Sequence, residues 1–365
     1  MKILFLVPYP PQGASNRFRV LQFLQYLTGE GLGCHVRPFY SESIWPVLYK
    51  PGHYREKLFH GLVCTLNRVL DLFRCLTYDI VFIHREAYPV GPAWFEGLLR
   101  LMGKPYVYDF DDAIFLPNVA RSNRLFARWK CPGKIGSIIR GSRITIAGNN
   151  YLAAFARAMG ARQVEVLPTV VDTDRFVPRA EGTRREDKVV IGWIGSLTTI
   201  DFVESFKPVM KRVLELCPGR ACFRIVGGNL TGPLPEGIAC VAWSSETELA
   251  ELQSFDIGIM PMPDNAWTQG KCAFKAIEYM AVGIPAVCSP VGMNRQLIRD
   301  GVNGFLPEEE EAWVEVLCRL AGDEALRSSI GAAGRETVER HYSVQVMAPR
   351  FKEVILKARS GVQNS

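Results

Sequence analysis

The 365-residue sequence lacks the cysteine patterns that mark a zinc ribbon or a disulfide framework. Its ten cysteines are scattered, and no two of them form a C-x-x-C pair. This scattering argues against a structural zinc site and against a small disulfide-stapled fold, and it is typical of proteins in a reducing compartment. We therefore expect a cytoplasmic protein with no metal.

Long apolar runs are also missing from the chain. No apolar stretch approaches the roughly 20 residues that a membrane-spanning helix needs. The apolar start, 3–7, is too short for the apolar core of a signal peptide, and a first β-strand explains it better. The sequence therefore predicts a chain that does not cross a bilayer.

Acidic residues are absent between Ala113 and Val164, where nine basic residues occur. Residues 1–185 carry 25 Lys/Arg and 14 Asp/Glu, whereas 186–365 carry 18 and 23. Two interpretations of the basic segment 121–143 stay open. It is either a solvated helix face or a contact with an anionic surface, such as lipid headgroups at the inner face of the membrane or a phosphorylated acceptor.

Nucleic acid is not expected as a partner of this basic segment. The neighbouring aromatic residues are too few to stack bases; they are Phe115, Phe126 and Trp129. A G-x-G-x-x-G motif after the first apolar run is also absent, which argues against a dinucleotide-binding dehydrogenase. We expect no cofactor.

Short apolar runs alternate with amphipathic stretches along the chain, which is the pattern of βαβ units and parallel sheets. Hydrophobic residues make up 48% and charged residues 22%, as in ordinary globular proteins, and the length allows two domains. In the first half, strands are predicted at 3–7, 34–38, 80–83, 106–109, 143–147 and 164–166. Helices are predicted at 17–27, 56–76, 93–102, 122–139 and 150–159.

The second half repeats this pattern after a polar linker at 168–187. Strands are predicted at 189–194, 222–226, 238–241 and 256–260, and around Ala286. Helices are predicted at 202–216, 246–252, around Glu278, and at 309–320, 324–339 and 344–357. The sequence thus predicts an α/β fold of two doubly wound, Rossmann-like domains, 1–185 and 186–340, with the ligand in the cleft at the strand carboxyl ends.

One short segment, 270–287, carries the most specific chemical signal. Lys271, Lys275 and Glu278 stand at steps of four and three, so we expect them on one face of a helix near its start. Cations at a helix N-terminus favour a diphosphate, and a carboxylate one turn later can accept hydrogen bonds from ribose hydroxyls. This combination indicates a nucleotide site. The alternative interpretation is a solvated helix with one lysine–glutamate pair.

The block 255–306, which contains this segment and the glycine-rich turn 300–306, resembles the donor-binding core of the group 1 (family 4) glycosyltransferases, which have the GT-B fold. The resemblance implies that Glu278, the second glutamate of a Glu-x₇-Glu motif, binds the ribose. Gly270 stands where the family has the first glutamate, which contacts the donor sugar. Asp264 or Asn265 is the candidate replacement. The resemblance also implies that 341–365 form a helix crossing back to the first domain.

A strand–glycine–helix junction, 194–199, is the predicted diphosphate cradle, built from Gly195, Ser196 and Thr198. The resembled family usually has Gly-Arg here and a lysine about five residues later. This chain has Ser196 and Asp201 instead, so Lys271 and Lys275 are the predicted catalytic cations. The alternative interpretation is an ordinary helix N-cap.

The N-terminal half supplies the predicted acceptor side. Asp109 and Asp111 follow a strand, and Asp109 stands where many relatives have a histidine near the reacting sugar. We expect the two aspartates to orient an acceptor hydroxyl or stabilise the transition state. The alternative interpretation is that one of the two aspartates only caps the following turn. His84, Gly13 and Arg17 are further candidates for contacts with the acceptor, sugar or phosphate, and Arg19 for an anion contact.

The sequence therefore predicts a hexosyltransferase that uses a UDP- or GDP-sugar and a lipid-linked or polysaccharide acceptor. Retention of the anomeric configuration is implied by the resemblance alone. Two alternatives stay open. One is a non-catalytic nucleotide-sugar-binding protein, and the other is a metal-dependent GT-A transferase that uses the D-x-D of Asp109 and Asp111.

Overall fold

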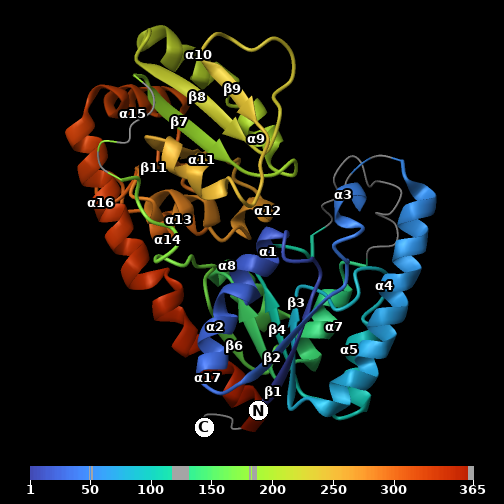
Figure 1. Cartoon of the computed structure of the whole chain (residues 1–365). Coiled ribbons are helices and arrows are strands. Elements are labelled where there is room, and N and C mark those ends of the chain that lie inside the picture. Colours follow the sequence, from blue (N-terminus) through green and yellow to red (C-terminus); the bar gives the residue numbers. More distant parts are fainter. Residues whose placement is uncertain (49, 51, 117–130, 181, 183–186, 361–365) are drawn as a thin grey trace. The chain divides into compact units, whose positions relative to one another are not determined.

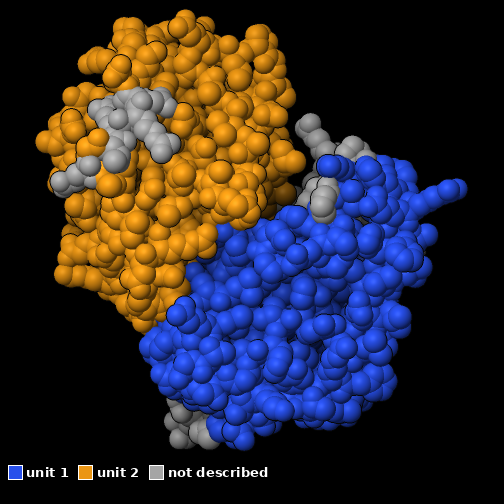
Figure 2. Space-filling view, in the orientation of Figure 1, with its two compact units in different colours: residues 1–169, 347–365 blue, residues 170–346 orange. Residues whose placement is uncertain are grey.

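The computed structural model describes residues 1–48, 50, 52–116, 131–180, 182 and 187–360 (Figure 1). The chain forms two compact units, which Figure 2 shows in separate colours. The N-terminal unit comprises residues 1–169 and 347–365, and the C-terminal unit comprises 170–346. None of the helices in the described part of the chain is both long and apolar enough to cross a membrane.

A six-stranded parallel sheet forms the centre of the N-terminal unit, in the order β2-β1-β3-β4-β5-β6. Its strands are β1 (Lys2–Val7), β2 (Gly33–Pro38), β3 (Ile80–His84), β4 (Tyr106–Phe110), β5 (Ile144–Ala147) and β6 (Val164–Val166). β3 and β4 are buried along their whole length, as expected for near-continuous apolar strands covered on both faces. All six strands predicted in this half are confirmed.

Helices connect these strands. They are α1 (Ala14–Asn16), the π-helical turn η1 (Arg17–Leu21), α2 (Gln22–Gly29), α3 (Trp45–Leu48), α4 (Tyr54–Arg74), η2 (Cys75–Thr77), α5 (Trp94–Leu101), α7 (Lys134–Gly141) and α8 (Asn150–Ala158). The predicted helix 17–27 is therefore part of a continuous helical segment, 14–29, that contains the π-helical turn η1, and α3 was not predicted. The first nine residues of the predicted helix 122–139 lie outside the described residues.

The C-terminal unit contains a second parallel sheet, in the order β11-β10-β7-β8-β9. Its strands are β7 (Val189–Ile194), β8 (Ala221–Val226), β9 (Ile238–Val241), β10 (Ile257–Met260) and β11 (Ala286–Cys288). Its helices are α9 (Ile200–Glu204), α10 (Lys207–Leu216), α11 (Glu248–Ser254), α12 (Ala266–Gln269), α13 (Phe274–Ala281), α14 (Asn294–Leu297), α15 (Glu310–Gly322) and α16 (Glu324–His341). The strand pattern predicted for this half is confirmed.

The predicted single helix 202–216 is wrong, because the structure has α9 and α10 in its place. Pro208 lies in the first turn of α10. Proline has no backbone N–H and is tolerated at the first turn of a helix but not in its interior. A new helix therefore begins at Lys207.

The first segment of the N-terminal unit ends at Thr169, whereas the sequence placed the boundary after residue 185. Val171 pairs with Ser343 in a parallel bridge. Arg335 of α16 donates to the backbone carbonyls of Phe176 at 2.6 Å and Thr173 at 3.1 Å. These contacts attach the segment after residue 169 to the end of the C-terminal unit.

The last helix, α17 (Val344–Ser360), begins in the C-terminal unit and continues in the N-terminal one from Met347 onward. Its Phe351 stacks on Phe23 of α2, with ring centroids 4.5 Å apart, and contacts Phe82 of β3 at 5.3 Å. Arg143 donates to the carbonyls of Ala358 and Arg359. These contacts make residues 347–360 part of the N-terminal core.

Candidate functional site

α13 carries two of the three residues of the predicted nucleotide motif. The helix begins at Phe274, because Ala273 before it has a left-handed backbone with φ 53°. Lys271 therefore lies in the turn before the helix, and the prediction that it shares a helical face with Lys275 and Glu278 is wrong. Its Nζ lies 3.8 Å from the ring centroid of Trp267 instead, a cation–π contact.

Lys275, in the first turn of α13, lies beside the carboxyl end of β7. Its Nζ is 5.6 Å from the ring centroid of Trp193 on β7. A Cβ atom added to Gly195 would lie 2.8 Å from Cε of Lys275 and 2.4 Å from the Trp193 ring. Only glycine fits at position 195. The structure thus brings Lys275 to the strand–glycine–helix junction that the sequence singled out.

The rest of this junction exposes hydroxyl groups. Ser196 and Thr198 are exposed, and their hydroxyls are hydrogen-bonded to each other at 2.8 Å. Thr199 is the N-cap of α9 but makes no side-chain cap, because its hydroxyl donates to the carbonyl of Ser196 at 3.2 Å. The capping interpretation of these side chains is therefore wrong, and the hydroxyls remain at the surface beside Gly195.

Glu278 follows Lys275 on α13 by three residues and is buried, with 4% of its surface exposed. The helix ends at Ala281 and is terminated by Gly283, whose φ is 73°. The amide of Gly283 donates to the carbonyl of Met280 at 3.0 Å, and that of Ile284 to Tyr279 at 3.1 Å, which is a Schellman ending. This ending fixes the length of the helix that carries Lys275 and Glu278.

The residues proposed to replace the missing first glutamate have local partners. Asn265 is the N-cap of α12 and accepts hydrogen bonds from the amides of Trp267 and Thr268, each at 3.0 Å. Asp264 is exposed and accepts from Nε2 of Gln269 at 2.6 Å. The oxygen of Asn265 therefore serves the fold of α12. Asp264 keeps its carboxylate at the surface.

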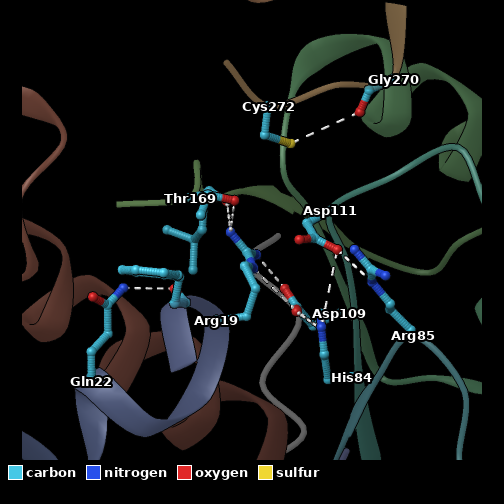
Figure 3. A network of polar contacts seen from close by, with 11 residues as sticks. Arg19, Gln22, His84, Arg85, Asp109, Asp111, Thr169, Gly270 and Cys272 are labelled. Atoms are coloured by element: carbon cyan, nitrogen blue, oxygen red, sulfur yellow. Dashed lines mark hydrogen bonds and ion pairs between the residues drawn. The ribbon is translucent and has the colours of Figure 1, made fainter. Parts of the chain in front are cut away.

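In the N-terminal unit, Arg19, His84 and Asp109 form a buried network at the carboxyl end of the sheet (Figure 3). His84 and Asp109 are register partners at the ends of β3 and β4. Asp109 accepts from Nδ1 of His84 at 2.6 Å and forms an ion pair with Arg19. Arg19 also donates to the carbonyl of Leu167 at 2.8 Å. Both oxygens of Asp109 are thereby engaged inside this unit.

Asp111 and Arg85, whose side chains are partly exposed, extend this network (Figure 3). Nε of Arg85 donates to Asp111 at 2.8 Å, and Nε2 of His84 lies 4.0 Å from the same oxygen. Arg85 has a left-handed backbone, with φ 60°, and its amide donates to the carbonyl of Asp109 at 2.7 Å. The strained turn at Arg85 therefore places its side chain against Asp111.

The network sets the charges of both carboxylates. Burial alone raises the pKa of Asp109, but Arg19 and His84 outweigh it and lower that pKa below its usual value. Burial opposes ionisation of Asp111 as well, yet Arg85 and His84 lower its pKa. Both aspartates are thus ionised at neutral pH. Nε2 of His84 is buried and has no hydrogen-bond partner among the described residues.

Gly13 has an ordinary extended backbone, with φ −75°. A Cβ atom there would lie 2.6 Å from Cβ of Tyr9, so packing against Tyr9 explains the glycine. The candidate contact of Gly13 with a ligand stays a prediction. Arg17 is half-buried at the start of η1, with its guanidinium 4.8 Å from the ring centroid of Phe18.

The basic segment 121–143 is only partly described, because 121–130 lie outside the described residues. In α7, Lys134 is buried; it donates to the carbonyl of Tyr88 at 2.7 Å and lies 3.4 Å from Glu86. Arg143 binds the carbonyl groups at the end of α17. Two of the basic residues in the described part are therefore held by contacts within the N-terminal unit, and both interpretations of the segment stay predictions.

From the sequence, Arg19 was predicted only as an anion contact, and Arg85 was not predicted as a site residue. One signal for Arg19 was present, since it stands between Phe18 and Val20 in a run that the structure buries. A buried arginine needs an acidic partner. The left-handed backbone of Arg85 had no signal in the sequence.

Three comparisons with known proteins relate this geometry to a family. Residues 188–323 match the family model described as glycosyl transferases group 1. The chain is 25% identical over 292 residues to a D-inositol 3-phosphate glycosyltransferase of Thermobifida fusca. That match covers 71% of this chain and 65% of the relative, so the chain spans just under two thirds of it.

Solved structures share the fold over nearly the whole chain. Sucrose-phosphate synthase of Thermosynechococcus elongatus superposes with a TM-score of 0.73 at 16% identity, covering 99% of this chain and 100% of that one. HepE of Anabaena, in complex with UDP and glucose, superposes with a TM-score of 0.66 at 15% identity, covering 98% and 100%.

These findings confirm the resemblance to the group 1 glycosyltransferases and the predicted GT-B fold class with two parallel sheets. The GT-A alternative is wrong, because a GT-A enzyme has no second nucleotide-type domain. The D-x-D carboxylates on which it rested bind Arg19, His84 and Arg85. Among the described residues, no group of three or more His, Cys, Asp or Glu is arranged to hold a metal ion.

Proposed function

We propose that this chain, whose residues 188–323 carry the group 1 glycosyltransferase domain, moves a hexose from a UDP- or GDP-sugar to a hydroxyl of a lipid-linked or polysaccharide acceptor. The observation that carries the proposal is the position of Lys275 beside Gly195 at the carboxyl end of β7. This edge of the sheet brings together a cation, a glycine that leaves no room for a side chain, and two exposed hydroxyls. Such a combination can bind a diphosphate.

The donor is held by the C-terminal unit in this proposal. Lys275 neutralises the diphosphate, the hydroxyls of Ser196 and Thr198 donate to it, and Lys271 adds a second positive charge at the rim. Glu278 accepts hydrogen bonds from the ribose hydroxyls. HepE, which shares the fold, is described in complexes with UDP, with UDP and glucose, and with UDP-glucose, which supports a uridine nucleotide as the first donor to test.

The reaction follows from this arrangement. The acceptor oxygen forms a bond to the anomeric carbon while the bond from that carbon to the diphosphate oxygen breaks. The proton of the acceptor hydroxyl passes to the departing diphosphate, so no strong general base is needed. Stabilising the negative charge that develops on the diphosphate is then the largest catalytic contribution, and Lys275 supplies it. Reaction on one face of the sugar retains the anomeric configuration.

The N-terminal unit receives the acceptor. It carries 25 Lys/Arg against 12 Asp/Glu, which supports an acceptor that bears phosphate or another anionic group. Asp109 acts as a positioning residue, because Arg19 and His84 occupy its oxygens. Asp111 and His84 are the proposed contacts for the acceptor. One relative is named a D-inositol 3-phosphate glycosyltransferase, and D-inositol 3-phosphate is a phosphorylated polyol.

A second candidate function is a nucleotide-sugar-binding protein without transferase activity. Its support is specific. Gly270 offers no carboxylate to the sugar, Asp264 already binds Gln269, and the oxygen of Asn265 caps α12. The phosphate junction also has Ser196 where relatives have arginine. A donor could therefore bind without being turned over.

Two measurements on the full chain separate these candidates. The first is a thermal-shift panel of UDP, GDP and their hexose conjugates, since a ligand that binds only the folded state raises the melting temperature. The second follows donor hydrolysis in the presence of the stabilising sugar nucleotide. We expect stabilisation by one nucleotide class together with slow hydrolysis. Stabilisation without any turnover supports the binding protein, and no stabilisation by any of these compounds contradicts both.

A further inference from the structure

α4 is a 21-residue helix on the outside of the N-terminal unit (Figure 1), and many of its apolar side chains are exposed. Leu58, Phe59 and Leu62 are each more than 60% exposed, and so are Leu66 and Phe73. The spacing of these residues, together with the half-exposed Val69 and Leu70, follows the period of one helical face. A contiguous exposed apolar stripe of this size marks a binding surface in a soluble protein.

The opposite side of α4 is polar and buried, so the orientation of the helix is fixed. Arg68 and Asp71 are each 1% exposed and form an ion pair at 3.4 Å. Asp71 also accepts from Nε of Arg37 on β2 at 3.0 Å. The hydroxyl of Thr65 is hydrogen-bonded to Tyr88 at 3.1 Å. Rotating the helix to hide the apolar stripe would expose this ion pair and leave Arg37 without its carboxylate.

The charge of the N-terminal unit indicates which kind of partner could bind the apolar stripe of α4. The N-terminal unit carries a net charge of +13, from 25 Lys/Arg and 12 Asp/Glu, whereas the C-terminal unit carries 18 and 25. Arg55 and Lys57 lie in the first turn of α4 and Arg74 in its last. Apart from the buried Asp71, the only acidic residue of this helix is Glu56, which contacts His53. Two copies joined through this face would bring two strongly positive units together.

We propose that α4 docks on an anionic lipid bilayer, with its apolar stripe in the boundary between headgroups and acyl chains. The helix is about 30 Å long at the usual rise per residue, and it lies along the surface because it carries charged residues at both ends and a buried ion pair between them. The positive charge of the N-terminal unit attracts the anionic headgroups. This inference does not depend on the proposed glycosyl transfer.

The test is co-sedimentation of the full chain with vesicles of phosphatidylcholine alone and of phosphatidylcholine with 30 mol% phosphatidylglycerol. The compared variants are Leu62→Gln/Leu66→Gln in α4 and Leu216→Gln/Val302→Gln, which changes two exposed apolar residues of the C-terminal unit. Thermal melting checks that each variant is folded. Because the substituted side chains are exposed, we expect all three melting temperatures to agree.

We expect the wild type and the control pair to bind the anionic vesicles, and the α4 pair to bind roughly tenfold more weakly because two apolar side chains are lost from the interface. Raising the salt concentration should release the wild type, and neutral vesicles should bind it weakly. Three results would overturn the proposal: no binding of the wild type, equal binding of the α4 pair, or equal binding to neutral and anionic vesicles. A dimer in solution that the α4 pair dissolves would also overturn it, by assigning the stripe to a second copy.

Discussion

The two units place charged side chains at the carboxyl edges of their sheets in opposite ways. In the N-terminal unit, Arg19, His84 and Asp109 are buried and bind one another. In the C-terminal unit, Lys275 is half-buried beside exposed hydroxyls on a glycine-containing junction. A buried carboxylate whose two oxygens are both engaged, as in Asp109, fixes the ends of strands, whereas a cation at an accessible junction is suited to a ligand. A charged residue at a strand end therefore indicates a binding site only when the structure shows which groups it contacts.

The largest effect on stability should come from removing Arg19 from the buried network that it forms with His84 and Asp109. Arg19→Ala leaves Asp109 buried without its main cation, so we expect it to lower the free energy of unfolding by about 3–5 kcal/mol. Urea unfolding followed by circular dichroism measures this. Lys357→Ala, which removes an exposed partner of Glu353 in the same unit, is the control and should leave the midpoint nearly unchanged. A loss for Arg19→Ala as small as that of the control would mean that the network does not hold the strand ends.

Removing the cation from the C-terminal junction should leave the fold intact and reduce turnover. We expect Lys275→Ala to lower kcat by about 10²–10³-fold, the usual cost of losing one donor to developing negative charge. Steady-state kinetics with the donor identified by thermal shift measures this. Lys211→Ala, an exposed lysine on α10, is the matched control. Lys271→Ala should reduce kcat less, because Lys271 lies outside the helix and contacts Trp267. Wild-type turnover of the Lys275 variant would refute the proposal that Lys275 neutralises the departing diphosphate.

A smaller effect is expected at the ribose contact. Glu278→Gln keeps the shape of the side chain but removes the charge that strengthens hydrogen bonds from two hydroxyls, so nucleotide affinity should fall by roughly tenfold. Calorimetric titration with the free nucleotide diphosphate gives this directly. Glu215→Gln on the exposed face of α10 serves as the comparison. If affinity is unchanged while the melting temperature drops, Glu278 is a structural residue.

The smallest effect concerns the pH dependence of stability. The pKa values of Asp109 and Asp111 are lowered in the folded protein by Arg19, His84 and Arg85. This contribution is complete above the unfolded aspartate pKa of about 4 and is lost as the pH falls below it. Asp111→Asn should therefore flatten the decrease in unfolding free energy between about pH 4 and pH 2. Urea titrations across that range test it, and an unaltered slope would contradict the expectation.

The strands of both sheets could be predicted from the sequence because a strand that is buried on both faces has a continuous run of apolar residues. β7, which is buried along its whole length, begins and ends where the sequence placed it, and β3 and β4 each extend one residue beyond the predicted end. It also predicted that 270–283 and the junction at Gly195 belong to one site, since both are local motifs. The fold class could therefore be read almost completely from local patterns.

Features that depend on distant contacts were not predictable in this way. The start of α13 depends on a left-handed Ala273, a conformation that alanine rarely adopts, so the sequence wrongly placed Lys271 within the helix. The network of Arg19 and Asp109 joins residues 90 positions apart. The apolar period of α4 was visible in the sequence, but the buried pair of Arg68 and Asp71, which turns that face outward, was not.

The passage of α17 from one unit to the other has a consequence for biosynthesis. Residues 170–346 are all made before residues 347–360, which complete the other unit through the contacts of Phe351 with Phe23 and Phe82. The C-terminal unit, 170–346, can thus fold during translation before the N-terminal unit is complete, because the last helix of the N-terminal unit has not yet been made. This reverses the amino-terminal-first order in which most multidomain chains fold.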